Sequence, residues 1–187
     1  NEVNISVGEF KIDSADDSVY SNGNIVITGG NISVASGDNG MHADGNLTIS
    51  DGTVDITKSY EGIEGSIVTI DGGTISVVAS DDGINCAGGS DTGSTDRMGA
   101  DQFSSQDGVE LNINGGTVTV DADGDGLDSN GNFTMAGGTV CVCGPTNGGN
   151  GALDYNGTAN VTGGTLIACG AVGMEEGFSD TSTQYSV

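Results

Sequence analysis

The sequence contains very few basic residues. Lys and Arg together number 3 among 187 residues, against 27 Asp and Glu, and the formal net charge is −24 at pH 7. Proteins that bind nucleic acid neutralise phosphates with Lys and Arg, so this charge excludes nucleic acid as a partner. The chain also lacks an apolar run of about 18 residues, so the sequence predicts no membrane span.

Proline, histidine and helical periodicity are also scarce. Pro145 is the single proline, His42 the single histidine, and no stretch keeps a helical apolar period for more than a turn or two. One histidine, without two cysteine pairs at ligand spacing, disfavours a transition-metal site. What remains is 35 glycines separating runs of Val, Ile and Thr, in which apolar and polar residues alternate as in β-strands.

Glycine corners recur at a fixed period of about 22 residues. Their last glycines are Gly30, Gly52, Gly73, Gly116, Gly138 and Gly164, which are 22, 21, 43, 22 and 26 positions apart, so one interval spans two periods and contains an insertion. A fixed period in this range is typical of a unit that stacks on copies of itself. Glycine suits such corners because it adopts positive φ without a Cβ clash.

Each period contains three short apolar segments. Two alternating segments flank the corner, as in Ile25 and Ile27 before Gly30 and Ile32 and Val34 after it. A first coil is predicted from Val3 to Ile12, with its corner at Gly8. The third segment supplies one inward residue per coil: Val19, Met41, Ile63, Ile84, Leu127, Leu153 and Met174.

Three faces per period predict an all-β fold, a single-stranded parallel β-helix of about 7–8 coils, and right-handed is the commoner expectation for three-sided coils. We expect one domain over residues 1–187, with an insertion loop at 88–107 and with termini that are truncated or uncapped. The chain begins at Asn1 without a visible signal peptide, which is typical of a processed or truncated chain.

Acidic residues occupy the same phase of most coils. They lie just before the third-face residue and directly after it. Coils of a β-helix are about 4.8 Å apart, so these carboxylates form ladders that need protons or cations. Calcium fits, because it takes six to eight oxygen ligands in irregular loops. The predicted metal ligands are Asp16, Asp17, Asp38, Glu61, Glu64, Asp81, Asp82, Asp123, Asp125, Asp128 and Asp154. A solvated acidic surface, or acids that share protons, is the alternative.

Several strings resemble a known family. They are Asp16–Gly23 (DDSVYSNG), Lys58–Glu64 (KSYEGIE), Asp81–Asn85 (DDGIN), Asp123–Gly131 (DGDGLDSNG), Gly144–Asn147 (GPTN), Gly151–Tyr155 (GALDY) and Ser182–Val187 (STQYSV). Together they resemble the carbohydrate-binding domain family of clostridial cell-surface β-helix proteins, which is similar in fold to calcium-dependent pectate lyases. The resemblance implies a secreted, wall-associated protein that holds calcium and binds cellulose or pectin-like polymers.

We therefore expect a non-catalytic binder of plant polysaccharide, in which calcium bridges protein and uronate carboxylates. Tyr20, Tyr60 and Tyr155 are the aromatic candidates for sugar contact, and Lys58 is a fourth candidate. Alternatively, Lys58 is the base of a pectate lyase, although neighbouring Glu61 and Glu64 would raise its pKa and favour a salt bridge instead.

Two further expectations concern the ends and the cysteines. Unpaired strand edges at the ends could stack coils of different molecules into a filament, which is a second alternative function. Cys143 and Cys169 are 26 positions apart, like their corners, so they are candidates for a disulfide between adjacent coils. Cys86 is expected to point inward and Cys141 outward.

Overall fold

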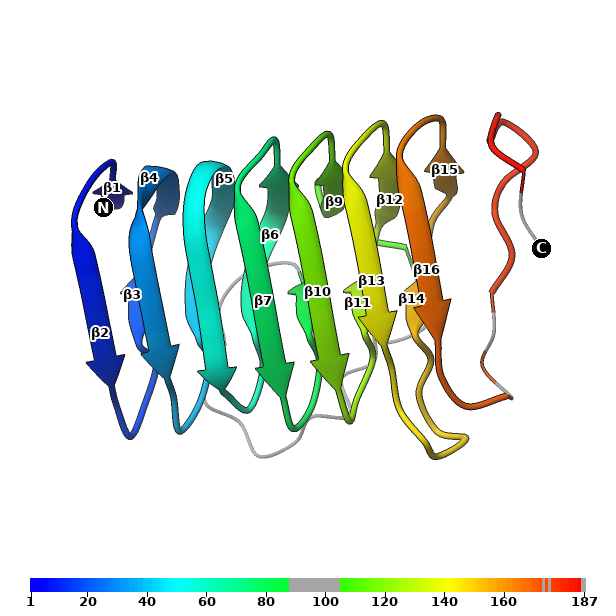
Figure 1. Cartoon of the computed structure of the whole chain (residues 1–187). Coiled ribbons are helices and arrows are strands. Elements are labelled where there is room, and N and C mark those ends of the chain that lie inside the picture. Colours follow the sequence, from blue (N-terminus) through cyan, green and yellow to red (C-terminus); the bar gives the residue numbers. More distant parts are fainter. Residues whose placement is uncertain (88–104, 173, 175, 186–187) are drawn as a thin grey trace.

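The chain folds into a right-handed parallel β-helix of about seven coils (Figure 1). The structure is a computed structural model that describes residues 1–87, 105–172, 174 and 176–185. In Figure 1 the near strands run downward, the chain returns behind them, and successive coils advance from left to right, which is a right-handed path. All strand pairs are parallel, and together they form one 16-stranded sheet.

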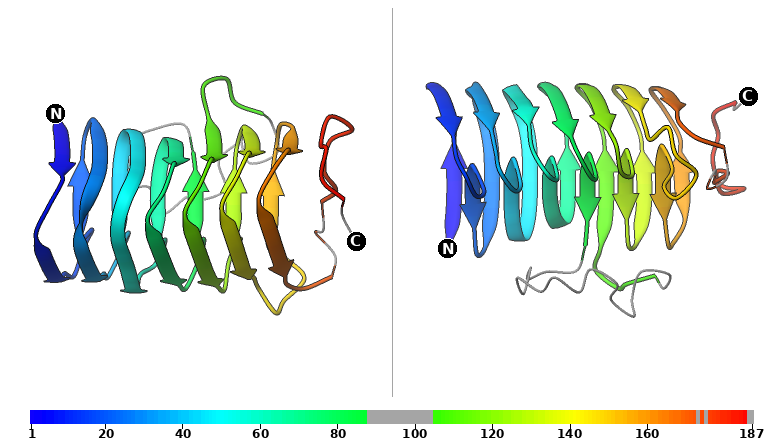
Figure 2. Two further views of the ribbon diagram at one scale, coloured as in Figure 1. Left: turned by 45° about the horizontal axis from the view of Figure 1, so that its top comes forward. Right: turned by 90° about the horizontal axis from the view of Figure 1, so that it is seen from below.

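Three stacks of strands form the sides of the helix, and Figure 2 shows them from two further directions. The front stack comprises β2 (Glu9–Asp13), the second half of β4 (Asn24–Ala35), the end of β5 (Met41–Lys58), β7 (Thr74–Ala79), β10 (Thr117–Ala122), β13 (Thr139–Cys143) and β16 (Thr165–Cys169). The short-strand stack comprises β3 (Val19–Ser21), the start of β5, the start of β6 (Ile63–Ile70), β8 (Ile84–Cys86), β11 (Leu127–Ser129) and β14 (Leu153–Tyr155). The back stack comprises β1 (Glu2–Ile5), the first half of β4, the middle of β5, the end of β6, β9 (Glu110–Ile113), β12 (Asn132–Met135) and β15 (Ala159–Val161).

The glycine corners connect the back stack to the front stack as the period predicts. The last glycine of each of these six corners has a positive φ, between 80° for Gly116 and 99° for Gly52. Gly8 has a φ of 121° and forms the corner of the first coil, so the prediction for residues 3–12 is confirmed. A side chain at these positions would meet the corner of the preceding coil, because a Cβ on Gly52 would lie 2.7 Å from the Gly30 carbonyl oxygen.

The core is a set of apolar columns that run along the helix axis. In the back stack, Leu47 lies in register with Ile25 and Val68, and all three are fully buried. Leu111, Phe133 and Ala159 extend the column. Full burial of one such aliphatic side chain contributes about 1.5–3 kcal/mol. The inward column of the short-strand stack also matches the prediction from Val19 to Leu153.

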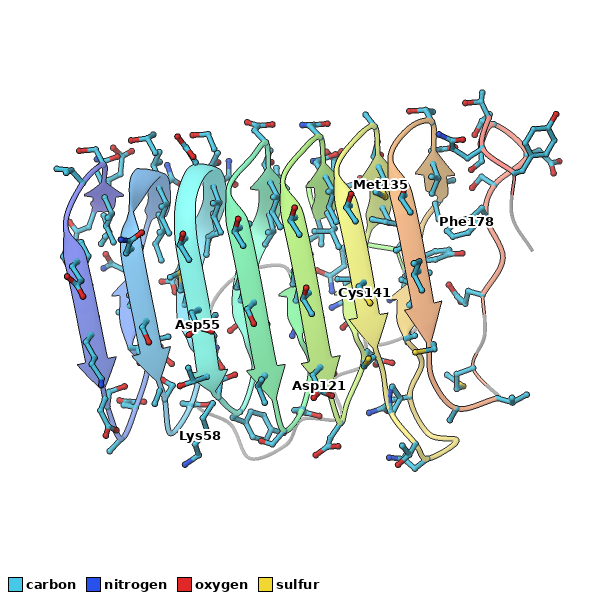
Figure 3. All side chains as sticks on the ribbon, in the orientation of Figure 1. Asp55, Lys58, Asp121, Met135, Cys141 and Phe178 are labelled. Carbon is cyan, nitrogen blue, oxygen red and sulfur yellow. The ribbon has the colours of Figure 1, made fainter. Side chains whose placement is uncertain are left out.

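Met174 departs from that prediction. It lies outside any strand and is 38% exposed, because the chain leaves the helical path after β16. The segment around Phe178 to Gln184 instead bonds to β15. Ser179 and Thr183 donate backbone hydrogen bonds to the Ala159 and Val161 carbonyls, at 2.8 and 3.0 Å. Figure 3 shows Phe178 pointing toward the end of the stack.

The insertion predicted at residues 88–107 lies almost entirely outside the described residues. The coils on either side of it pair directly, since Ile67 in β6 is in register with Glu110 in β9. No helix long and apolar enough to cross a membrane occurs among the described residues.

Candidate functional site

The turn that leads into the short-strand stack has the same pattern in most coils. A polar residue at the corner is followed by glycine, then by the inward apolar residue, then by an outward polar residue, as in Asp82-Gly83-Ile84-Asn85. The glycine donates its N–H to the corner carbonyl of the next coil, at 2.9 Å from Gly62 to Asp82 and 2.8 Å from Gly83 to Asp125. Backbone bonding therefore holds the corner residues in register.

In the middle coils, only glycine fits between the corner residue and the inward residue. A Cβ on Gly83 would lie 2.2 Å from Val120 Cγ1 and 2.6 Å from the Gly126 carbonyl oxygen. Gly62 and Gly126 are equally crowded, with the nearest atoms at 2.2 Å. The glycine lets neighbouring turns approach closely enough for the carboxylates on either side of it to interact. This glycine column was missed in the sequence, although the recurring acid–Gly–apolar–polar pattern could have revealed it.

Two polar columns result on the outer surface. The outer column, in strand register, is Tyr20, His42, Glu64, Asn85, Asp128 and Asp154. The corner column is Asp17, Asn39, Glu61, Asp82, Asp125 and Gly151, whose order follows from the hydrogen bonds between turns. The vertical registry predicted for the acidic residues is therefore present. Glu175, the next residue of the predicted outer column, lies outside the described residues.

His42 organises the first part of these columns. Its imidazole Nδ1 lies 3.3 Å from Asp17 Oδ2 and 3.6 Å from Glu64 Oε2, and its Nε2 lies 3.5 Å from Asp44 Oδ1. Asn39 Nδ2 also donates a short hydrogen bond to Glu64, and the Asn39 N–H donates to Asp17 Oδ1 at 3.0 Å. We call these residues the His42 cluster.

The surroundings of His42 favour a charged imidazolium. Burial alone lowers its pKa, but the hydrogen bond to Asp17 and the charges of Glu64, Asp17 and Asp44 outweigh burial and raise the pKa to about 9. The ring is only 4% exposed. Near neutral pH the His42 cluster therefore contains its own cation among its carboxylates.

Asp82, Asp125 and Asp128 form a second cluster further along the columns. One carboxylate oxygen from each lies within 4.8 Å of the others, and all three side chains are half-buried. Asp82 Oδ1 accepts the Asp125 N–H at 2.6 Å, and Asp125 Oδ1 accepts the Gly151 N–H at 2.5 Å. We call these three residues the Asp82 cluster.

Burial is the main reason that carboxyl pKa values are raised around the Asp82 cluster. It raises the pKa of Asp82 to about 7 and that of Asp125 to about 6, with further contributions from the charge of Asp81 on Asp82 and of Asp154 on Asp125. The pKa of Asp128 is raised well above its usual value by burial and by the charge of Asp82. Burial and the charge of Glu64 raise the pKa of Glu61 to about 8. No Lys, Arg or His forms an ion pair with these acids within the described ranges.

Asn85 lies between the two clusters in the outer column. It is in register with Glu64 on one side and Asp128 on the other, and its Nδ2 donates to Glu61 Oε2 at 3.2 Å. Its Oδ1 is buried and has no hydrogen-bond partner in the described part of the chain. An unpaired buried carbonyl oxygen costs about 1–3 kcal/mol unless it gains a donor or a cation.

The donor chemistry of the Asp82 cluster fits a hard cation. Its carboxylates and the unpaired amide oxygen nearby are the oxygen ligands that Ca²⁺ takes in irregular turns. Cysteine and histidine are not among them, which disfavours a transition metal.

The other predicted metal ligands occupy different positions. Asp16, Asp17 and Asp38 bring oxygens within 4.8 Å of one another, but Asp16 is exposed and Asp17 contacts His42. Asp81 and Asp154 border the Asp82 cluster and act on it through their charge. Asp123 is exposed and belongs to neither group of three acids.

Lys58 does not approach the acids as predicted. It is exposed and forms no ion pair with Glu61 or Glu64, and Figure 3 shows it projecting from the turn at the end of β5. The reason is an irregularity in strand pairing. Val34 pairs with Ile56 but Ala35 pairs with Lys58, so Thr57 is an extra residue at the end of the strand.

The three candidate tyrosines occupy different positions in their coils. Tyr20 is 52% exposed in the outer column, where its hydroxyl lies 3.3 Å from each carboxylate oxygen of Asp44 and its ring meets His42 edge-on at 5.2 Å. Tyr60 occupies the position equivalent to Asp38 in the next coil, and its N–H donates to the Asp38 carbonyl. This position directly precedes the corner column. Tyr155 is in register with the inward residue Ser129 and packs against the core, with its hydroxyl bonded to the Gly177 carbonyl at 2.6 Å.

All four cysteines are free thiols in the structure. Cys86 is buried and Cys141 half-buried, as their phases predict. Cys143 and Cys169 are direct partners on β13 and β16, so the predicted adjacency is confirmed and the disulfide stays a prediction.

Comparison with known proteins identifies the family. The sequence matches the model of the family described as carbohydrate-binding domain-containing protein over residues 1–40 and 41–151. Both candidate clusters lie within the matched residues. Comparisons with curated proteins and with solved structures give no match. The match spans well over half of the sequence, and the chain therefore belongs to the carbohydrate-binding domain-containing family.

Proposed function

We propose that this chain is a non-catalytic, calcium-dependent module that binds plant cell-wall polysaccharide, either cellulose or polygalacturonate, at a bacterial cell surface. Family membership supports carbohydrate binding. The acidic columns support the calcium dependence. The observation that carries the proposal is the Asp82 cluster, in which three half-buried carboxylates converge without a basic partner among the described residues.

Asp82, Asp125 and Asp128 would hold the ion, and Asn85 Oδ1 is a further oxygen donor beside them. A bound Ca²⁺ supplies positive charge that attracts carboxylates of a polyuronate, which answers how a chain with a charge of −24 could bind an anion. The protein's own part is to fix three carboxylates in register through the hydrogen bonds between turns.

Tyr20 is the aromatic group best placed for sugar contact. Its ring is exposed, and Asp44 and His42 hold it in one orientation. A fixed aromatic face binds the apolar side of a sugar ring at little entropic cost, and a nearby carboxylate accepts sugar hydroxyl hydrogen bonds. Tyr60 and Lys58 remain candidates at the turns, whereas the inward packing of Tyr155 favours a structural role.

A pull-down assay on insoluble cellulose and on immobilised polygalacturonate, in calcium and in EDTA, tests the proposal. We expect retention in calcium and release in EDTA. The variant D82N/D125N/D128N should lose calcium-dependent retention, and D123N, which removes a nearby exposed acid, should keep it. Absence of binding to both polymers in calcium would refute the proposal, and retention that EDTA leaves unchanged would refute the role of calcium.

The two alternatives have separate tests. A calcium-dependent lyase that uses Lys58 would release unsaturated products from polygalacturonate, and K58A would abolish their absorbance. End-to-end assembly would appear as a concentration-dependent increase in size by size-exclusion chromatography and as fibres by electron microscopy.

A further inference from the structure

Two exposed cysteines meet on the front stack near the end of the helix. Cys143 is the last residue of β13 and Cys169 the last residue of β16, and the two are register partners in a regular parallel pair that begins at Thr139 and Thr165. Adjacent strands are about 4.8 Å apart, which lies within the Cα separation of about 4.4–6.8 Å that a disulfide requires.

The two side chains lie side by side on the outer face, because register partners in a parallel pair point the same way. The neighbouring Cys169 thiol raises the pKa of Cys143, and Cys169 Sγ lies 3.4 Å from the Val142 carbonyl oxygen. Both thiols are exposed, so a small oxidant can reach them. A bond between them requires no change in strand pairing.

The position would strengthen a weakly held element. β16 is the terminal strand of the pairing order and bonds only to β13 among the described strands. Its Leu166 is half-buried and its Ala168 is exposed, whereas their partners Val140 and Val142 are fully buried. A covalent link at its end would hold it on the stack.

We propose that Cys143 and Cys169 form a redox-dependent disulfide that fastens the last coil to the preceding one. With a small-molecule disulfide such as oxidised glutathione as oxidant, one cysteine thiolate attacks a glutathione sulfur and displaces one glutathione. The second cysteine thiolate then attacks the protein sulfur of the mixed disulfide and displaces the other glutathione. Two protein thiols are oxidised, and one glutathione disulfide is reduced to two glutathione molecules.

The remaining cysteines provide internal controls. Cys141 lies two residues before Cys143 on the same face, and its strand partners are Thr119 and Ile167, neither of which is a thiol (Figure 3). It can therefore form a mixed disulfide, but neither of its register partners can form a disulfide with it. Cys86 is buried, so its labelling reports whether the protein has unfolded.

The test is to incubate the whole chain with oxidised glutathione, alkylate the remaining thiols without denaturant, and map the peptides by non-reducing mass spectrometry. We expect a Cys143–Cys169 linked peptide while Cys86 remains unlabelled. C169S should abolish the link, and C141S should retain it. A link between Cys141 and either other exposed cysteine, or separate alkyl or glutathione adducts on Cys143 and Cys169, would overturn the proposal.

A thermal measurement tests the stabilising role. The melting temperature of the oxidised protein should exceed that of the reduced protein by about 5 °C, and the difference should vanish in C169S. An equal or lower melting temperature in the oxidised protein would contradict it.

Discussion

The His42 cluster and the Asp82 cluster lie in the same two columns but compensate their carboxylates differently. In the first, a buried imidazole lies within 3.6 Å of Asp17, Asp44 and Glu64. In the second, three carboxylates converge with no basic side chain among them in the described part of the chain. Stacking thus brings carboxylates of adjacent coils close together repeatedly, and the residue type in each coil determines how their repulsion is compensated.

The repulsion between carboxylates of adjacent coils is large compared with the stability of a domain. Two carboxylates one coil apart repel by about 3.5 kcal/mol at an effective dielectric constant near 20. A domain is stable by only about 5–15 kcal/mol in total. A charged histidine removes this repulsion at the first cluster. At the second cluster, carboxyl protonation or a bound cation must do so, and burial favours the protonated form until a cation binds.

The change with the largest expected effect removes the registry on which both clusters depend. G83A would place a Cβ 2.2 Å from Val120 Cγ1, beside the Asp82 cluster. We expect a loss of about 3 kcal/mol in the free energy of unfolding, the upper end of the usual range for overpacking, because the clash forces neighbouring turns apart. G177A is the control, because no atom of the described residues lies within 4 Å of its Cβ position and its φ is not positive. Denaturant unfolding that gives equal stabilities for the two variants would contradict the role of the glycine column.

Replacing His42 should leave the carboxylates of the His42 cluster without a positive charge beside them. H42Q should lower the free energy of unfolding near pH 7 by about 1.5–3 kcal/mol, the contribution typical of hydrogen bonds to charged groups. K58Q removes an exposed cation that has no ion-pair partner among the described residues, and it should change stability by less than about 0.5 kcal/mol. Chemical denaturation compares them, and equal effects would show that charge at His42 is unimportant.

Neutralising one acid of the Asp82 cluster should raise the free energy of unfolding, whereas H42Q should lower it. D128N should stabilise the protein in EDTA near pH 7 by about 1 kcal/mol, because an amide at this position requires neither a buried charge nor the uptake of a proton on folding. The same variant should gain less stability from calcium than the wild type does. D123N should alter neither value, since Asp123 is exposed and outside the cluster. A calcium response in D128N equal to that of the wild type would exclude Asp128 as a ligand.

The pH dependence should show a smaller effect from both clusters. Asp82 has a folded pKa of about 7, above its ordinary value of 3.8, so the folded state holds the proton more tightly and stability in EDTA falls as pH rises from about 4 through 7. The folded pKa of His42 is about 9 against 6.5, so its contribution is complete below pH 6.5 and is lost as pH rises through 9. Thermal unfolding in EDTA should therefore give a melting temperature about 2–4 °C lower at pH 8 than at pH 6.

Calcium and H42Q separate the two contributions to that slope. Calcium should flatten the part below pH 7 by holding the carboxylates of the Asp82 cluster deprotonated. H42Q should flatten the part between pH 6.5 and 9. A melting temperature in EDTA that rises steadily from pH 6 to pH 8 would contradict both assignments.

The sequence was sufficient to predict the fold because each signal depends on the nearest coils alone. The corner glycines, the inward Ile and Val, and the acidic columns all follow from one period, which fixes which residues lie above one another. The position of a glycine with positive φ can be predicted from the period alone, because its role depends only on the local backbone.

The details of the site depend on atoms that the period does not place. The period predicts that His42 lies in the outer column, but the charge of His42 depends on Asp17 and Asp44. Asp17 belongs to the preceding coil, and Asp44 lies two residues after His42 on the same strand. Asn39 bonding to Glu64 and the unpaired Asn85 oxygen follow from side-chain orientation. Lys58 was placed wrongly because the extra residue Thr57 ends the regular alternation. Tyr155 was placed wrongly because it lies one position after the outer-column residue Asp154 and therefore points inward.

Calcium titration of thermal stability tests the central claim most directly. In the wild type, millimolar calcium after EDTA treatment should raise the melting temperature by about 5–10 °C, the shift expected when the ligand is present at about a hundred times its dissociation constant. D82N/D125N/D128N should show no such rise, whereas H42Q should retain it. A wild-type melting temperature that does not change with calcium would contradict the account.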